Sequence, residues 1–174
     1  RTLKYFGKVG VLGHSEGGSI AFMLGAKGKV DFVISMAGIG VRGDTALTAQ
    51  ANRLLELSGQ PMRLSTLQYH VNAYMKKSPW LNFFMDYDPS GDITKTLCPV
   101  MAINGERDVQ VISSLNLIGI KGHLTENPKN FVKEYPALNH LFQHCMTGNV
   151  SEYRMIEETI SPEVLEDIVR FIKQ

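Results

Sequence analysis

A serine between glycines gives this chain its clearest chemical signal. Residues 13–17 read Gly-His-Ser-Glu-Gly, which fits the G-x-S-x-G pattern with Ser15 at its centre. In this pattern the serine sits on a sharp turn between a strand and a helix, and glycines leave room for backbones that pass close together. The turn exposes the hydroxyl and leaves the next backbone N–H, that of Glu16, available to an oxyanion. These residues suit nucleophilic attack on an acyl carbon.

A serine hydroxyl needs a base to take its proton, and the base needs an acid to orient it. Where this turn is used, the chain order is serine, then Asp or Glu, then His. Asp108 follows a predicted strand at 99–104, and His140 follows a predicted strand at 130–134. Both therefore fall in loops at the carboxyl ends of strands, where an open α/β sheet builds its site. The sequence predicts Ser15, Asp108 and His140 as a catalytic triad.

Other acidic and histidine residues compete for these roles. Glu106, Asp88 and Asp92 are rival acids, while Asp108 is favoured by its place after the strand. The remaining histidines are expected to be structural or exposed: His14, His70, His123 and His144. His14 occupies the variable position before the serine, so we expect its side chain to point away from Oγ.

The elements around these residues predict an α/β fold. Apolar runs predict strands at 8–12, 31–36, 99–104 and 130–134, and helical patterns separate them. This alternation favours a mostly parallel sheet flanked by helices. In the last helix, Ser161 suits the cap position and Pro162 the first turn. We expect its buried face to carry Leu165, Ile168, Val169 and Ile172, with Glu166, Asp167, Arg170 and Lys173 toward water.

Three segments together resemble a known group of enzymes. GHSEGG, CPVMAINGERDVQV and PALNHLFQH look like the nucleophile, acid and histidine segments of bacterial α/β-hydrolases, especially the esterase-like and serine-aminopeptidase-like members. The resemblance extends along almost the whole chain. It implies the α/β-hydrolase fold, with the triad roles on Ser15, Asp108 and His140. It leaves the substrate open, because esters, thioesters and peptides are all cleaved on this fold.

The resemblance also implies a division of the chain. Residues 1–43 and 93–174 would form the α/β-hydrolase core, and residues 44–92 would form a helical cap inserted over the nucleophile. The cap segment contains an aromatic cluster. Candidates for lining a substrate pocket are His14, Trp80 and Phe84, although aromatic side chains in a cap also pack it onto the sheet.

The nucleophile appears unusually early, at residue 15. The resemblance implies strands before it, so the sequence resembles the C-terminal portion of such an enzyme. One oxyanion donor is expected at the Glu16 N–H, and the second from a loop after an earlier strand. We therefore expect an N-terminal segment or a homo-oligomer to complete the sheet, since an unpaired buried-type strand edge invites pairing.

Composition excludes several classes of partner. The 174 residues carry 18 basic and 17 acidic side chains, a net charge of +1 without a basic stripe, which gives no support for nucleic-acid or anionic-membrane binding. Cys98 and Cys145 are expected to be free thiols, and no histidine combines with them at a zinc-like spacing. GIGVRG at 38–43 matches a dinucleotide pattern, but the strand and acidic residue required after it are missing. We expect no cofactor and no metal, and no targeting segment is present to indicate a compartment.

These observations predict a serine hydrolase that cleaves a carboxylic ester or related acyl bond of a small molecule. A serine exopeptidase of the same fold is the nearest alternative, with Glu16 or Asp86 available to bind a substrate amine. An incomplete, non-catalytic fragment that needs a partner segment is the alternative from another class.

Overall fold

The computed structural model describes residues 7–68, 70 and 78–174. Parallel strands form a four-stranded sheet in chain order: β1 (Gly10–His14), β2 (Phe32–Met36), β3 (Val100–Gly105) and β4 (Phe131–Tyr135). The four strand predictions are confirmed, with ends shifted by one or two residues. Because all strands run the same way, the loops that follow them meet at one edge of the sheet.

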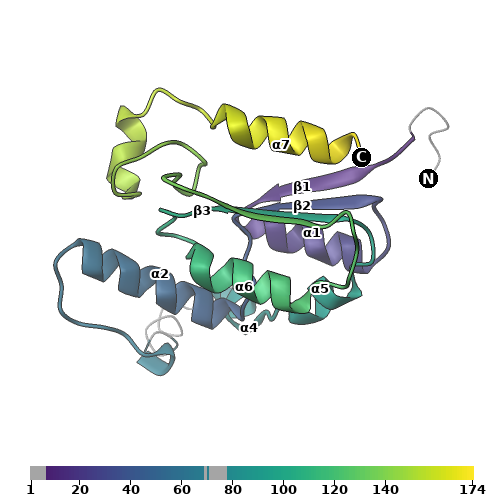
Figure 1. Cartoon of the computed structure of the whole chain (residues 1–174). Coiled ribbons are helices and arrows are strands. Elements are labelled where there is room, and N and C mark those ends of the chain that lie inside the picture. The colour runs from purple at the N-terminus through teal and green to yellow at the C-terminus, as the bar shows by residue number, and fades with distance from the viewer. Residues whose placement is uncertain (1–6, 69, 71–77) are drawn as a thin grey trace.

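Helices cover both faces of the sheet (Figure 1). One face carries α1 (Glu16–Ala26), α5 (Ser90–Lys95) and α6 (Ser113–His123). The other carries α7 (Pro162–Ile172), which follows a 3-10 helix, η1 (Val150–Met155), that the sequence did not predict. Two further helices, α2 (Gly43–Leu57) and α4 (Pro79–Asp86), pack against each other between β2 and α5 in the chain. The prediction of a parallel sheet flanked by helices is confirmed.

Alternate side chains of the strands enter two apolar cores. Ile34 and Met101 face α7, whereas Val33 and Val100 face α1, α5 and α6. β2 and β3 are therefore buried on both sides, which explains why their sequences are apolar without a polar alternation. These two strands form the rigid centre from which the loops of the site project.

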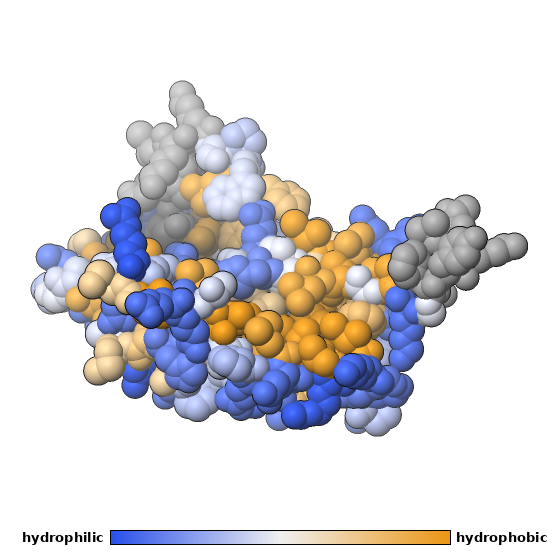
Figure 2. Space-filling model, turned by 90° about the horizontal axis from the view of Figure 1, so that it is seen from above, coloured by the Kyte–Doolittle hydropathy of each residue, from blue (hydrophilic) through white to orange (hydrophobic). Residues whose placement is uncertain are grey.

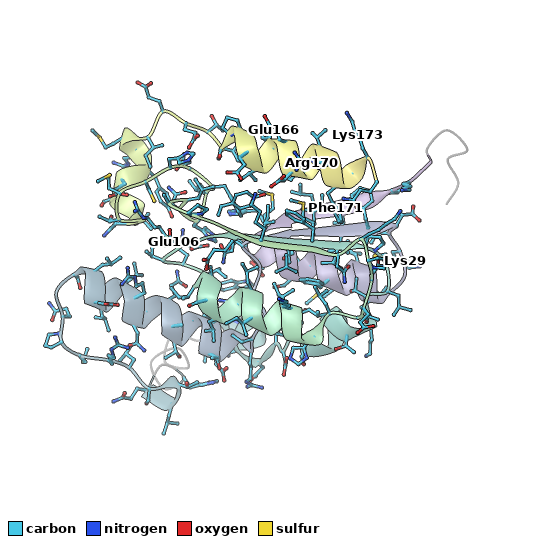
Figure 3. All side chains as sticks on the ribbon, viewed as in Figure 1. Lys29, Glu106, Glu166, Arg170, Phe171 and Lys173 are labelled. Carbon is cyan, nitrogen blue, oxygen red and sulfur yellow. The ribbon has the colours of Figure 1, made fainter. Side chains whose placement is uncertain are left out.

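The buried face of α7 differs from the predicted one. The side chains that enter the core are Val164, Ile168 and Phe171, and Asp167 is buried beside them. Leu165, Val169 and Ile172, expected in the core, are 46, 48 and 44% exposed. Figure 3 shows Phe171 directed from α7 toward the sheet, with Glu166 and Lys173 directed away.

Asp167 is buried because it has three partners. Its carboxylate accepts hydrogen bonds from the Tyr135 hydroxyl and the Lys133 ammonium at 2.8 Å each, and from Arg170 at 2.8 Å. A buried carboxylate is tolerated when it is paired in this way. Ser161 occupies the cap position of α7 as predicted, but its side chain makes no capping hydrogen bond.

The β1 edge of the sheet is the less covered side. Leu12 lies in register with Ile34 and so faces the α7 side, yet it is 51% exposed. Seen from above, apolar side chains gather in the middle of the surface (Figure 2). The exposed apolar residues of this face include Leu12 on β1 and Leu165, Val169 and Ile172 on α7. We call these four residues the exposed apolar face.

Cys98 and Cys145 are both free thiols. No helix within the described ranges is both long and apolar enough to cross a membrane. Among the same residues, no group of three or more His, Cys, Asp or Glu side chains could hold a metal ion.

Candidate active site

Ser15 lies on a strained turn between β1 and α1. Its backbone has φ 58° and ψ −121°, a region that non-glycine residues rarely occupy. The Ser15 N–H donates to the Met36 carbonyl at 2.8 Å, which holds the turn against the end of β2. A Cβ on Gly13 would lie 1.8 Å from the Gly17 carbonyl oxygen, so only glycine fits there. Strain of this kind costs about 1–3 kcal/mol and clusters at active sites and ligand-binding sites.

Asp108 lies in the loop after β3 with its carboxylate fully hydrogen-bonded. Oδ1 accepts the backbone N–H groups of Gln110 and Val111 at 2.8 and 2.9 Å. Oδ2 lies 2.7 Å from Nδ1 of His140. The Asp108 side chain is 0% exposed and that of His140 is 6% exposed. The carboxylate therefore fixes the ring orientation and favours a proton on Nδ1, which leaves Nε2 as the basic nitrogen.

The loop that carries His140 is tied to its surroundings on both sides. The Leu138 carbonyl accepts from the Arg107 N–H at 2.9 Å, which joins this loop to the one that carries Asp108. Asn139 is fully buried, and its Oδ1 accepts the N–H groups of Leu141 and Gln143. These bonds set the position of the His140 backbone independently of its side chain.

His14 contacts the histidine loop directly. Its Nε2 lies 2.8 Å from the His140 carbonyl oxygen, so the ring donates there, and the two rings lie 4.6 Å apart. Burial, the largest cause, lowers the pKa of His14 below its ordinary value and favours the neutral ring. His14 lines a cavity with Phe142 and Ile160 and not the cavity of Ser15. This geometry agrees with a side chain that points away from Oγ and does not support the pocket role predicted for His14.

Ser15 is near the histidine loop but is not hydrogen-bonded to it. In the described part of the chain, no hydrogen bond joins the Ser15 hydroxyl to Nε2 of His140, and neither atom has another hydrogen-bond partner. Such bonds are often long in the absence of substrate and shorten when it binds. The geometry brings Asp108 and His140 together and places His140 against the residue that precedes Ser15.

Ser15 opens into a cavity of about 190 Å³. Trp80 and Phe84 from α4, two of the candidates for lining a substrate pocket, line this cavity, and their rings stack with centroids 5.7 Å apart. Trp80 Nε1 donates to the Glu16 carboxylate at 2.8 Å. Glu16 is also the first residue of α1, a position whose backbone N–H has no acceptor within the helix. That N–H is positioned to meet an anion beside Ser15.

Several lining residues were not foreseen. No sequence pattern had singled out the other lining residues, which are Ile39, Ala46, Leu47, Gln50, Gln110 and Val111. Gln110 and Val111 belong to the turn whose N–H groups donate to Asp108. Their position just after Asp108 in the segment CPVMAINGERDVQV could have indicated that they lie near the site.

The rival acids lie in other hydrogen bonds. Glu106 accepts from the Ala137 N–H, Asp88 from the Ser90 N–H and Asp92 from the Tyr87 hydroxyl. Within the described residues none of the three is hydrogen-bonded to a histidine.

The remaining histidines lie apart from Ser15. His70 pairs with Asp44 at 2.8 Å, His144 pairs with Glu158 at 3.0 Å, and His123 is exposed at the end of α6. Burial alone would raise the pKa of Asp44, but hydrogen bonds from His70 and Arg42 lower it to about 2. Asp44 is therefore ionised at neutral pH.

The glycines of 38–43 serve close packing. A Cβ on Gly38 would lie 2.3 Å from Oγ of Ser35 and 3.2 Å from Cα of Gly18 in α1. A Cβ on Gly43 would lie 1.8 Å from the Phe84 carbonyl oxygen. The absence of side chains at Gly38 and Gly43 thus lets the backbone of this segment approach α1 and α4 closely, and Ile39 between them lines the cavity.

A comparison with known families finds a match along most of the chain. The family model described as "BAAT / Acyl-CoA thioester hydrolase C terminal" matches residues 4–144, a range that contains Ser15, Asp108 and His140. None of the curated proteins matches the sequence.

Solved structures share the fold at low sequence identity. An esterase of Pyrococcus furiosus is 15% identical with a TM-score of 0.56, over 94% of this chain and 52% of its own. Est1E of Butyrivibrio proteoclasticus, solved with ferulic acid bound, is 15% identical with a TM-score of 0.54, over 99% and 63%. A meta-cleavage product hydrolase of Pseudomonas fluorescens is 15% identical with a TM-score of 0.57, over 95% and 65%. The chain thus spans between about half and two thirds of the length of these three proteins.

Proposed function

Because the chain belongs to the BAAT / acyl-CoA thioester hydrolase C-terminal family and has the α/β-hydrolase fold, we propose that it is a serine hydrolase of carboxylic esters or related acyl compounds. The observation that supports this most is the placement of His140. Its Nδ1 lies 2.7 Å from the buried Asp108, and its carbonyl accepts from His14, next to the strained Ser15.

In the proposed mechanism, Ser15 Oγ attacks the acyl carbon while Nε2 of His140 takes its proton. Asp108 holds the Nδ1–H and stabilises the imidazolium that forms. The Glu16 N–H stabilises the oxyanion, and a second donor is expected from outside the described residues. His140 then protonates the leaving group, and water hydrolyses the acyl-enzyme by the reverse sequence of proton transfers.

The contacts of the acidic side chains favour ester cleavage over exopeptidase activity. An exopeptidase needs a free carboxylate for the substrate amine. Glu16 already accepts from Trp80, and Asp86 pairs with Arg42 at 2.7 Å. A small uncharged acyl substrate needs neither carboxylate.

We propose that residues 44–92 act as the cap. Trp80 and Phe84 of α4 and Leu47 of α2 lie over the cavity into which Ser15 opens. Closure by such a segment would exclude water from the acyl-enzyme and strengthen the hydrogen bonds around it.

We propose that an additional N-terminal segment pairs with β1. This strand lies at one edge of the described sheet, and Val9 before it and Leu12 within it are about half exposed. The solved relatives that share the fold are longer than this chain. A segment of that kind would cover the exposed apolar face and bring the second oxyanion donor. The competing proposal is that the chain is a non-catalytic fragment. It differs in its expectation for Ser15, which need not be reactive in such a fragment.

Intact-mass analysis after treatment with a small alkyl fluorophosphonate tests the proposal. We expect a single adduct on the protein and none on Ser15→Ala, because only a serine activated by a base reacts readily with this reagent. Asp92→Asn serves as the matched control and should be labelled like the unmodified protein. A folded protein without an adduct would contradict the proposal and favour the non-catalytic alternative.

A further inference from the structure

The cavity beside Ser15 has a small volume. About 190 Å³ is available, and its walls are mainly apolar: Ile39, Ala46, Leu47, Trp80, Phe84 and Val111. An engineered apolar cavity of about 150 Å³ in another protein binds benzene, which gives the scale. The space therefore fits one aromatic ring with a short extension, or an aliphatic chain of about six to eight carbons.

The wall formed by Trp80 is held at two points. Its indole N–H donates to Glu16 at 2.8 Å, and its ring stacks on Phe84 with an interplanar angle of 26°. Phe84 is buried, and the Gly43 N–H binds the Tyr87 carbonyl at 2.9 Å, which ties the end of α4 to the start of α2. These contacts give the indole a defined position over the cavity.

Trp80 is nevertheless dispensable for the core. It is 52% exposed, so a smaller residue there would lengthen the cavity without leaving a void in a packed interior. Phe83, three residues after Trp80 in α4, is 61% exposed and does not line the cavity. The same helix therefore offers a test residue and a matched control.

The charge of the lining also limits the substrate. Glu16 is the one ionisable side chain among the described residues that line the cavity, and Gln50 and Gln110 are neutral amides. The Glu16 carboxylate would repel an acyl group that carries its own negative charge, such as the acyl group of a dicarboxylate half-ester.

We propose that this cavity receives a short aliphatic or single-ring, uncharged acyl group and that Trp80, held by Glu16, sets the upper limit of its length. The inference rests on the proposed serine hydrolysis. The acyl carbon bonds to Ser15 Oγ as its bond to the leaving oxygen or sulfur breaks, and the serine proton passes through His140 to that leaving atom. Water then releases the acid, so the step needs no other reactant.

The test measures kcat/KM for p-nitrophenyl acetate, butyrate, hexanoate, octanoate, dodecanoate and benzoate. We expect a maximum near hexanoate, good activity with benzoate, and a fall of roughly tenfold or more for dodecanoate. Trp80→Ala should shift the maximum toward the longer chains, whereas Phe83→Ala should leave the profile unchanged. Trp80→Phe keeps a ring for stacking but loses the bond to Glu16, so an intermediate shift measures the role of that bond.

Two outcomes would overturn the inference. Dodecanoate as the best substrate of the unmodified protein would show that the cavity does not limit chain length. A profile that Trp80→Ala and Trp80→Phe both leave unchanged would show that Trp80 does not set the limit. Labelling of Ser15 by a small fluorophosphonate separates this failure from that of the proposed function. A labelled protein with a flat profile contradicts only the acyl-length inference, and an unlabelled one contradicts both.

Discussion

The two sides of the sheet differ in how completely the described chain surrounds them. On the β3–β4 side, Asp108 and His140 are buried, and hydrogen bonds join their two loops. On the β1 side, Ser15 directly follows β1, an edge strand of the described sheet on which Leu12 is about half exposed. The contact between Asp108 and His140 is thus complete within the described residues, whereas Ser15, the proposed nucleophile, follows the strand at the more exposed edge.

This difference separates two questions about activity. The orientation of His140 depends on its contacts with Asp108 and His14, which both lie within the described residues. In the proposed mechanism, full stabilisation of the oxyanion needs a second donor, and the loss of one such donor costs a factor on the order of a hundred to a thousand in kcat.

The largest effect is expected at the buried pair. Asp108→Asn should lower kcat by a factor on the order of 10³–10⁴, because the amide no longer favours the required tautomer of His140. Steady-state kinetics with p-nitrophenyl hexanoate measures it. Asp92→Asn should retain activity. An equal loss of kcat in that variant would contradict the assignment of Asp108 as the acid that orients His140.

A second effect concerns the stability of the β4–α7 side. Asp167→Asn should lower the free energy of unfolding by roughly 2–3 kcal/mol at pH 7, because it removes the charge that Lys133 and Arg170 face. Urea unfolding measures the change.

The same variant should show a defined pH dependence. Burial alone would raise the pKa of Asp167, but hydrogen bonds from Lys133 and Tyr135 lower it below its ordinary value. A carboxyl with a lowered pKa in the folded state stabilises the protein above its unfolded pKa, about 3.9, and loses this contribution as pH falls through the folded pKa. The difference between Asp167→Asn and the unmodified protein should therefore shrink below about pH 4. A constant difference down to pH 2 would contradict the assignment.

A smaller effect is expected where the two sides meet. His14→Ala removes the donor to the His140 carbonyl and should lower kcat by roughly tenfold with little change in KM. His14→Gln retains a donor and should recover part of the rate. Equal losses in kcat and KM for both variants would show that His14 only packs against its neighbours and does not position the loop that carries His140.

The smallest effect is expected at the open edge. Leu12→Thr should change the free energy of unfolding by no more than about 0.5 kcal/mol, because Leu12 is already exposed. Ile34→Thr, at the position in register with it, should cost roughly 2–4 kcal/mol, since Ile34 is fully buried. Thermal unfolding compares the two variants. A large cost at Leu12 would show that another segment or a second copy covers this face.

Local patterns predicted much of the fold. The apolar runs located all four strands, and the G-x-S-x-G segment located the turn between β1 and α1. These features depend on residues adjacent in the chain, whose conformational preferences act over a few positions. The order of the strands then placed Asp108 and His140 in loops at the same edge, and the structure brings them to 2.7 Å. Their catalytic roles remain predictions.

Other features could not be predicted because they depend on distant contacts. α7 has apolar residues on more than one side, so its periodicity did not determine whether Val164 and Phe171 or Leu165 and Val169 face the core. The hydrogen bond from Tyr135 to Asp167 fits the orientation in which Val164 and Phe171 of α7 face the core.

The sequence by itself determined the order of the strands and of the main helices, the turn at Ser15 and the residue types from which a triad could be built. Only the tertiary structure decided which acid meets His140, that His14 supports its loop, and that Trp80 binds Glu16 over the cavity. Each of these contacts joins residues separated by 32, 126 or 64 positions. Such contacts form when packed elements bring distant segments together, and local periodicity carries no information about them.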